Sequence, residues 1–346
     1  MPDTGSAISF PVATPPDPGT EVEIADGVLW IRLPLPMALD HVNVYALDDG
    51  ESWTLVDTGV NTSACRRAWN AILAGPLADK PVRRVFLTHH HPDHVGCAGT
   101  FAENGAALYA SRVGYLTARM LTLDVQDRPL PETLSFWRAA GMDEALVLRR
   151  AAERPFNFSD IVAPIPLGFT RLDAGDVISA GGRTWDIRVG HGHAPDHLTF
   201  WSRDDNLVIG GDQFLPSISP NLGVYATEPY ADTVGDWLRS CRAFEAFARS
   251  DQLVLPGHKL PFTGLPERLR HKIDNHVQAL DRLRGHLDRP YSAAQCFVPI
   301  FGREIGADDT AYGLALGEAV GHLNHLLALG EVSRESRDGV WVWRRV

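Results

Sequence analysis

The sequence contains no long apolar segment, few cysteines and no excess of positive charge. No apolar run approaches the roughly 20 residues that a membrane-spanning helix needs, so no integral membrane protein is expected. The 4 cysteines are widely spread and form no Cys-x-x-Cys pair. We therefore interpret them as small buried side chains of a protein from a reducing compartment. Cys97 is the one that could have a functional role, since it lies close to a histidine-rich stretch.

The net charge and the N-terminal sequence indicate which partners and which location to expect for the protein. A net charge of −11 argues against a surface that binds polyanions in general. Residues 1–20 are rich in proline, carry no basic residue and lack the pattern of a signal peptide. We expect residues 1–24 to form a flexible arm of a cytoplasmic protein. The remaining chain, within a total of 346 residues, is long enough for two domains or one large domain.

The most informative stretch is histidine-rich. Four histidines and one aspartate lie between His89 and His94. The preceding residues 82–87 alternate and include β-branched residues, as a strand does, so the histidines leave a strand and enter a loop. Binding residues are commonly held in such loops by a rigid scaffold. Because imidazole and carboxylate are ligands of zinc and similar metals, the stretch predicts a metal site.

At these residues the sequence resembles the metallo-β-lactamase superfamily, whose motif reads His-x-His-x-Asp-His. Here the motif residues are His89, His91, Asp93 and His94. The resemblance covers roughly residues 25–260, and it implies an α/β fold of the αββα sandwich type with further ligands later in the chain. Those ligands are found in order, which makes the resemblance more specific than one motif could.

Three later motifs agree with the resemblance. The family's third-histidine motif aligns with residues 192–197, so that His193 is the implied ligand and His191 a bystander. Ala194 and Asp196 depart from the family's pattern, which puts the polar contacts of this loop in doubt. Gly-Gly-Asp at residues 210–212 and Pro-Gly-His at residues 256–258 each follow an expected strand, and they imply Asp212 and His258 as the remaining ligands.

The resemblance implies two divalent metal ions, most readily zinc, with iron or manganese as alternatives. One ion would take His89, His91 and His193, the other would take Asp93, His94 and His258, and Asp212 would bridge them. A hydroxide shared by two such ions attacks a carbonyl or phosphoryl group without a protein nucleophile. Asp93 is the expected catalytic residue, because it could orient that hydroxide or carry a proton. Residues that could support the metals or contact substrate are Asp57, His197, Tyr225, Tyr230 and Lys259.

The chain divides into a catalytic domain, residues 25–264, and a C-terminal domain, residues 265–346. Within the first, residues from about 111 to 165 resemble a helical insertion, either a cap with its own core or a wall of the substrate cleft. The large apolar side chains behind the second alternative are Phe136, Trp137, Met142, Phe156 and Phe158. In the second domain, apolar residues recur at helical spacing over 265–287, and further helices precede a hairpin that turns at Asp338. This order resembles a winged helix.

The function most consistent with these features is a metal-dependent hydrolase of a small ester, thioester or lactone. Asp212 argues against antibiotic hydrolysis, because the two-metal β-lactamases of the superfamily lack a bridging carboxylate there. The alternatives are a nucleic-acid-processing hydrolase and a winged-helix regulator with structural metals. Residues 309–333, which contain the would-be recognition helix, hold no lysine or arginine, so nucleic-acid binding is not expected. The expected partner is a small molecule, and a homodimer stays open.

Overall fold

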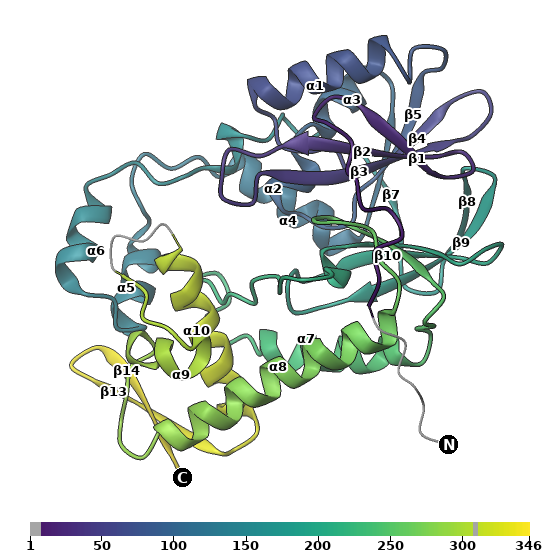
Figure 1. Ribbon diagram of the computed structural model, residues 1–346. Coiled ribbons are helices and arrows are strands. Elements are labelled where there is room, and N and C mark those ends of the chain that lie inside the picture. Colours follow the sequence, from purple (N-terminus) through teal and green to yellow (C-terminus); the bar gives the residue numbers. More distant parts are fainter. Residues whose placement is uncertain (1–7, 307–310) are drawn as a thin grey trace, which may run out of the picture.

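The computed structural model describes residues 8–306 and 311–346, which form two packed β-sheets covered by helices on both outer faces (Figure 1). The first sheet has seven strands in sequence order, and it runs from antiparallel pairs at β1–β4 to parallel pairs at β4–β7. Its strands are β1 (Glu21–Ala25), β2 (Val28–Pro34), β3 (His41–Asp48), β4 (Trp53–Val56), β5 (Val82–Phe86), β6 (Ala107–Ala110) and β7 (Thr170–Arg171).

The second sheet has five strands in the order β12-β11-β10-β9-β8, with antiparallel pairs throughout except the parallel pair β11–β12. Its strands are β8 (Val177–Ala180), β9 (Arg183–Gly190), β10 (His197–Ser202), β11 (Leu207–Gly211) and β12 (Leu253–Pro256). The inner faces of the two sheets share one apolar core, in which Trp30 and Phe86 of the first sheet meet Phe200 of the second. Burial of these alternating side chains joins the sheets into a sandwich.

Helices bury the outer face of each sheet. The first sheet packs through Leu55 and Val85 against α1 (Ser63–Ala74), α3 (Ala98–Glu103) and α4 (Arg112–Leu123). Thr62 caps α1 by accepting a hydrogen bond from the backbone N–H of Cys65. The second sheet packs through Trp201 against α7 (Thr233–Glu245) and the C-terminal helices. The αββα arrangement expected from the sequence is confirmed.

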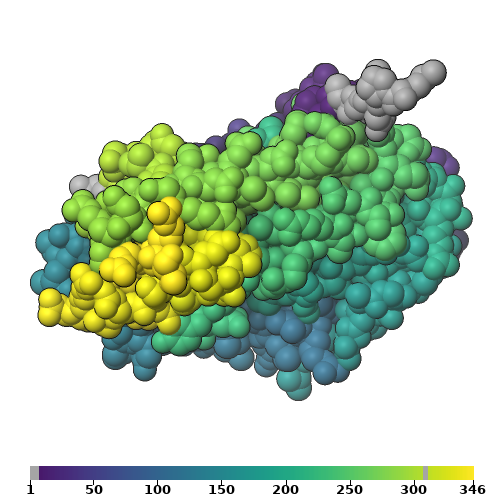
Figure 2. Space-filling model, turned by 90° about the horizontal axis from the view of Figure 1, so that it is seen from below, coloured from purple at the N-terminus to yellow at the C-terminus, as the bar shows by residue number. Residues whose placement is uncertain are grey.

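The C-terminal elements follow the predicted order of helices and a hairpin. They are α8 (Leu265–His286), α9 (Phe297–Phe301), α10 (Tyr312–Ala328), β13 (Val332–Arg337) and β14 (Val340–Arg345). Viewed from below, α8 and the yellow hairpin cover much of the lower face (Figure 2). Helix α10 is buried over most of its length, with Leu316, Val320 and Leu323 in the core against α7 and α8. The helix that could have read nucleic acid is therefore a core helix here.

The insertion is helical, as expected, but most of it does not wall a cleft. Its helices are α4, α5 (Pro131–Ala139) and α6 (Glu144–Ala151). Phe136 and Met142 are buried in the core that contains the C-terminal helices, and Phe136 meets Trp341 of β14. Trp137 packs against the same core. Of the two alternatives for the insertion, these three residues favour a cap, because the C-terminal module offers them an apolar surface to bury against.

The N-terminal segment is partly held against the sandwich. Residues 1–7 lie outside the described part of the chain, but the expectation of a flexible arm is wrong for the residues after them. Ser9 pairs with Thr263, and β1 forms the edge strand of the first sheet beside β2. Alternating Val22 and Ile24 pack onto the inter-sheet core, which explains why the segment is held.

Among the described residues, no helix has both the length and the apolar character needed to cross a membrane.

Candidate metal centre

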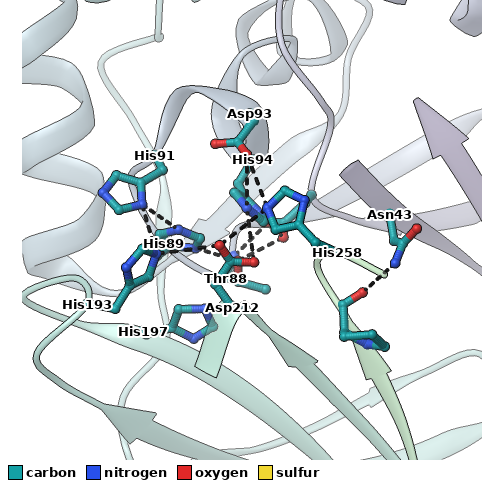
Figure 3. A network of polar contacts seen from close by, with 12 residues as sticks. Asn43, Thr88, His89, His91, Asp93, His94, His193, His197, Asp212 and His258 are labelled. Carbon is teal, nitrogen blue, oxygen red and sulfur yellow. Dashed lines mark hydrogen bonds and ion pairs between the residues drawn. The ribbon is translucent and has the colours of Figure 1, made fainter. Parts of the chain in front are cut away.

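The metal-ligand candidates come from separate places in the chain and meet at one edge of the sandwich (Figure 3). The segment after β5 carries His89 and His91 in a loop and Asp93 and His94 in the short helix α2 (Pro92–Val95). The turn between β9 and β10 carries His193, and the ends of β11 and β12 carry Asp212 and His258. Strands of both sheets end at this edge, so loops from both halves of the sandwich converge there. The seven side chains that the sequence predicts as ligands are thus brought together.

One group of three imidazoles converges on a common point. The Nε2 atom of His89 lies 2.9 Å from Nδ1 of His91, which lies 3.0 Å from Nε2 of His193. Burial and the neighbouring imidazoles hold the pKa of both His89 and His91 well below the ordinary histidine value. Nitrogens of neutral imidazoles that face one another at such distances have lone pairs available for a shared cation.

The second group combines carboxylate and imidazole donors. The Nε2 atom of His258 lies 3.3 Å from Oδ2 of Asp93, and Nε2 of His94 lies 3.7 Å from the same oxygen. Burial lowers the pKa of His258, but attraction to Asp212 and Asp93 outweighs it and raises the pKa to about 10. The pKa of His94 is likewise raised, because Asp93 and Asp212 outweigh its burial. In the metal-free state, these imidazoles therefore hold protons where the second ion would lie.

Asp212 lies between the two groups. Its Oδ2 atom is 3.5 Å from Nε2 of His193 and 3.3 Å from Nε2 of His258, and its Oδ1 atom is 3.5 Å from Nε2 of His94. Both Asp212 Oδ1 and His94 Nε2 are buried without a hydrogen-bond partner. Buried polar atoms are normally satisfied, so these two, aimed at the same point, fit ligand atoms of a cation. The nitrogen and oxygen donors of both groups suit zinc.

Asp57 supports the candidate ligands from behind, which is one of the two roles that the sequence left open for it. Its carboxylate accepts hydrogen bonds from the backbone N–H and the hydroxyl of Thr88, both at 2.8 Å. It also lies 2.7 Å from Nδ1 of His94, which leaves Nε2 of that ring to face the metal group. Asp57 has a φ of 63°, a strained conformation for a residue other than glycine. This backbone conformation places the carboxylate beneath the histidine motif, and the three hydrogen bonds offset the free-energy cost of the strained φ.

Backbone carbonyls orient two further ligands. The Nδ1 atom of His258 lies 2.8 Å from the carbonyl oxygen of His41, and Nδ1 of His193 lies 2.8 Å from that of Asn221. Such contacts set which nitrogen faces a metal. Sequence reasoning missed both partners, because a backbone carbonyl has no residue signature. Thr88, directly before the motif, could have been found from its position.

Gly257 is required by the crowding around Asp212. A Cβ atom on this residue would lie 2.3 Å from Oδ1 of Asp212 and 2.9 Å from the ring of His94. No side chain fits there without moving ligand atoms. The Pro-Gly-His sequence before the last ligand therefore has a steric reason.

The structure gives His191, in the β9–β10 turn, and His197, at the start of β10, different surroundings. His191 is half exposed, contacts the Pro195 carbonyl and lies outside both ligand groups, as expected for a bystander. His197 is fully buried and stacks on His89, and its Nε2 accepts the backbone N–H of Asp212 at 3.0 Å. Of the two roles that the sequence left open for His197, supporting the metal ligands or contacting substrate, these contacts favour support.

The remaining candidates differ in their placement. Tyr230 is exposed and packs against Arg334 and Trp341 of the C-terminal hairpin, so it is no anchor at the metal centre. Tyr225 is half exposed and belongs to the loop after Asp212, the same loop that contacts His193. Lys259 follows His258 with a φ of 69°, and its backbone N–H donates to Nε2 of His41. The last two lie on segments that contact ligands.

Aromatic residues of the insertion approach the metal loop from one side. The ring of Phe158 is parallel to that of His90, with centroids 6.4 Å apart, and Phe156 lies next to Phe158. Phe156 is 61% exposed. Of the five apolar residues singled out in the insertion, these two keep a position from which they could contact a substrate.

Comparison with known families covers nearly the whole chain. A family model described as the Metallo-beta-lactamase superfamily matches residues 37–285. A second model, described as the Metallo-beta-lactamase-like C-terminal domain, matches residues 280–346. The chain is similar to a probable metallo-hydrolase, YqjP, of Bacillus subtilis, with 28% identity over 88% of this chain and 93% of that protein.

Two solved structures share the architecture. A beta-lactamase domain protein from Burkholderia ambifaria is 33% identical, with a TM-score of 0.88 over 98% of this chain and 97% of that one. A metallo-beta-lactamase family protein from Thermus thermophilus is 25% identical, with a TM-score of 0.77 over 94% of this chain and 100% of that one. Both likenesses include the C-terminal elements as well as the sandwich.

Proposed function

Since the chain belongs to the metallo-β-lactamase superfamily and is a metallo-hydrolase of that fold, we propose that it is a dinuclear zinc enzyme. Its proposed substrate is a small ester, thioester or lactone. His89, His91 and His193 hold one ion in this proposal, and Asp93, His94 and His258 hold the other. Asp212 contributes to both.

The observation that carries the proposal is the position of Asp212 between two complete donor groups. Each group offers three ligand atoms, and Asp212 lies within 3.5 Å of histidines from both. A mononuclear site would leave one of the groups without a cation to offset the burial of its donors, which is costly. Bound ions supply Lewis acidity and lower the pKa of water, so that a nucleophile forms near neutral pH.

Asp93 is the most exposed of the donors proposed for the second ion, and it can contact a reacting molecule. Its side chain is 19% exposed, whereas those of His94, His258 and Asp212 are 0%, 2% and 9% exposed. Its carboxylate accepts from His258 at 3.3 Å and stays close to the other donors. A carboxylate that is both a ligand and accessible can orient an attacking water and receive its proton.

A small substrate is supported by the surroundings of the centre. The net charge of −11 opposes binding of a phosphate backbone. Helix α10 lies in the core, so it offers no exposed face to a nucleic-acid groove. The exposed ring of Phe156 and the neighbouring Phe158 provide apolar contacts next to the metal loop, as small-molecule sites commonly require.

The direct test is a substrate panel on zinc-reconstituted full-length protein. It contains acyl thioesters, lactones, aryl esters and bis-phosphodiesters, and each is assayed with the wild type and with Asp212→Asn and His191→Ala. We expect turnover of a thioester, lactone or ester by the wild type and by His191→Ala, with a loss of at least about 100-fold in Asp212→Asn. Turnover of phosphodiesters alone, or equal activity of all three proteins, would contradict the proposal.

A further inference from the structure

The C-terminal domain contacts the metal centre through the segment that joins Asp212 to α7, residues 215–232, here called the bridging loop. We propose that Glu318, on α10 of the C-terminal domain, is a positioning residue for His193 and acts on it through Asn221 of this loop. The inference rests on the proposed role of His193 as a zinc ligand. It concerns how one ligand is held, a role that neither the fold nor the motifs assign to any C-terminal residue.

Two hydrogen bonds form the connection. The Oε2 atom of Glu318 accepts from the side-chain amide of Asn221 over 2.7 Å, and the same amide donates over 3.2 Å to the backbone carbonyl of Leu314 on α10. The backbone carbonyl of the same Asn221 lies 2.8 Å from Nδ1 of His193, whose Nε2 faces His91 and Asp212. The carbonyl thus fixes the tautomer and the plane of the ring, and Glu318 fixes the residue that bears the carbonyl. A displaced Asn221 would turn His193 away from the other donors.

His193 differs in this respect from its partner ligands. The second nitrogen of His94 is held by Asp57, and that of His258 is held by the carbonyl of His41. Both supports belong to the sandwich itself, in β3 and at the end of β4. The support of His193 lies in a loop without regular structure, so its position depends on what holds that loop.

The bridging loop is held by the two long C-terminal helices along its length. From α8, Arg268 and Lys272 are buried and donate to the carbonyl of Ile218. From α10, Asn324 donates to the carbonyls of Pro229 and Ala231, near the far end of the loop. Burying polar side chains is costly unless their hydrogen bonds are made, so these contacts tie the loop firmly to α8.

The loop approaches α10 so closely that the helix has no room for side chains at two positions. A Cβ atom on Gly317 would lie 2.8 Å from the carbonyl oxygen of Val224, and one on Gly321 would lie 2.9 Å from that of Leu222. Gly317 directly precedes Glu318 in the chain. The contact therefore brings the loop backbone onto the helix at the point where Glu318 reaches Asn221.

The buried polar cluster behind Glu318 is better explained as packing than as a cation site. His276 of α8 and His322 of α10 have ligand atoms near that of Glu318. However, Nδ1 of His276 lies 3.3 Å from Nε2 of His322, so the two rings are already paired with each other. The carboxylate of Glu318 is already engaged by Asn221. The cluster thus joins α8 to α10 and supports Glu318.

The test measures zinc affinity, not turnover, on metal-free full-length protein by competition with a chromophoric chelator. Glu318→Ala removes the nearer of the two acceptors of the Asn221 amide and leaves the carbonyl of Leu314, whereas Asn221→Ala removes the donor while keeping its own backbone carbonyl. We expect each to weaken the zinc site that contains His193 by about tenfold, at the lower end of the range for residues that orient metal ligands. Glu318→Gln keeps an acceptor oxygen and should retain the wild-type affinity.

The matched control is Asn324→Ala, which removes another α10 contact to the same loop but not the one at Asn221. It should leave the zinc affinity within about twofold of the wild type. The double variant Glu318→Ala/Asn221→Ala should lose no more than Asn221→Ala alone, because the connection is already broken once the Asn221 amide is absent. With cobalt in place of zinc, Glu318→Ala should alter the visible absorption spectrum, and Glu318→Gln should restore it.

Three results would overturn the inference. The first is wild-type zinc affinity in Glu318→Ala and Asn221→Ala, and the second is an equal loss in Asn324→Ala, which would indicate general loosening of the loop. The third is failure of Glu318→Gln to restore the spectrum. In each of these cases the wild type still binds two ions, so the proposed function stands. A wild type that binds no zinc would instead refute the proposed function itself.

Discussion

The carboxylate of Asp57 and the Nδ1 atom of His94 lie 2.7 Å apart, and both side chains are buried. Because a buried carboxylate accepts the proton of Nδ1, the other ring nitrogen is left to face Asp93 and Asp212. The same carboxylate also accepts two hydrogen bonds from Thr88, directly before the histidine motif. One side chain thereby orders the loop that carries four of the seven proposed ligands.

Replacing this carboxylate should weaken metal binding without touching a ligand. We expect Asp57→Ala to lower zinc affinity by about 10–100-fold, because His94 loses the partner that selects its tautomer. Chelator competition on metal-free protein measures the effect. Lys80→Ala, which removes an ion pair with Asp48 away from the centre, is the control and should bind zinc as the wild type does. Unchanged affinity in Asp57→Ala would refute the role of the pair.

The two histidines of the β9–β10 turn should differ sharply on substitution. His193→Ala removes a nitrogen that lies 3.0 Å from His91, so we expect the zinc content to fall and hydrolysis to be lost. His191→Ala removes a half-exposed ring outside both groups, and it should change neither quantity appreciably. Elemental analysis of the two purified variants, beside the wild type, makes the comparison. Similar losses in both would mean that the third motif is aligned wrongly.

Zinc binding should release protons and strengthen as the pH rises. The raised pKa values of His258, about 10, and of His94 mean that both rings are protonated near neutral pH in the metal-free protein. Each ring must lose its proton to bind zinc, so affinity should increase from about pH 6 to about pH 9, by up to about tenfold per pH unit for each proton released. Calorimetric titration with zinc in two buffers of different ionisation enthalpy counts the protons.

An apparent binding enthalpy independent of the buffer would contradict this expectation. The variant His258→Ala provides the internal comparison, since it removes one of the two protonated rings. It should release fewer protons than the wild type near neutral pH, while also binding less zinc.

Two aromatic residues of the insertion should behave differently. Phe158 lies beside His90 at the metal loop, so we expect Phe158→Ala to lower kcat/KM for the best substrate while the metal content stays constant. Phe136 lies in the core shared with the C-terminal helices, and Phe136→Ala should cost roughly 3–5 kcal/mol of stability without changing substrate preference. Kinetics on the substrate panel and thermal unfolding of both variants test the contrast.

The opposite pattern, a change of specificity in Phe136→Ala and only a loss of stability in Phe158→Ala, would place the substrate elsewhere. It would also restore the interpretation of the insertion as a cleft wall around Phe136.

The sequence predicts the ligands better than it predicts their supports. His89 to His94 are adjacent in the chain, and His193, Asp212 and His258 each follow a strand within a recognisable motif, so local patterns suffice to find them. The carbonyls of His41 and Asn221 carry no such pattern, since every residue has a carbonyl. They become supports only because strands and loops distant in sequence meet at one edge.

The choices that the sequence leaves open have a common physical origin. Phe136 and Met142 have the apolar character of a pocket wall, but also that of a core, and only the docking of α5 and α6 on the C-terminal module decides between them. The sequence leaves His197 open between supporting the metals and contacting substrate, and the backbone turn at Gly211, with a φ of 48°, favours support because it carries Asp212 over the ring. In both cases packing between segments distant in sequence determines where the side chains lie, and such packing cannot be recognised from a local sequence pattern.

The account's central claim is that two metal ions bind on either side of Asp212. The most direct measurement is an anomalous-scattering map at the zinc edge from crystals of zinc-loaded protein. The account predicts two peaks of similar height, one among His89, His91 and His193 and the other among Asp93, His94 and His258. A single peak at zinc saturation, or zinc bound away from Asp212, would contradict it.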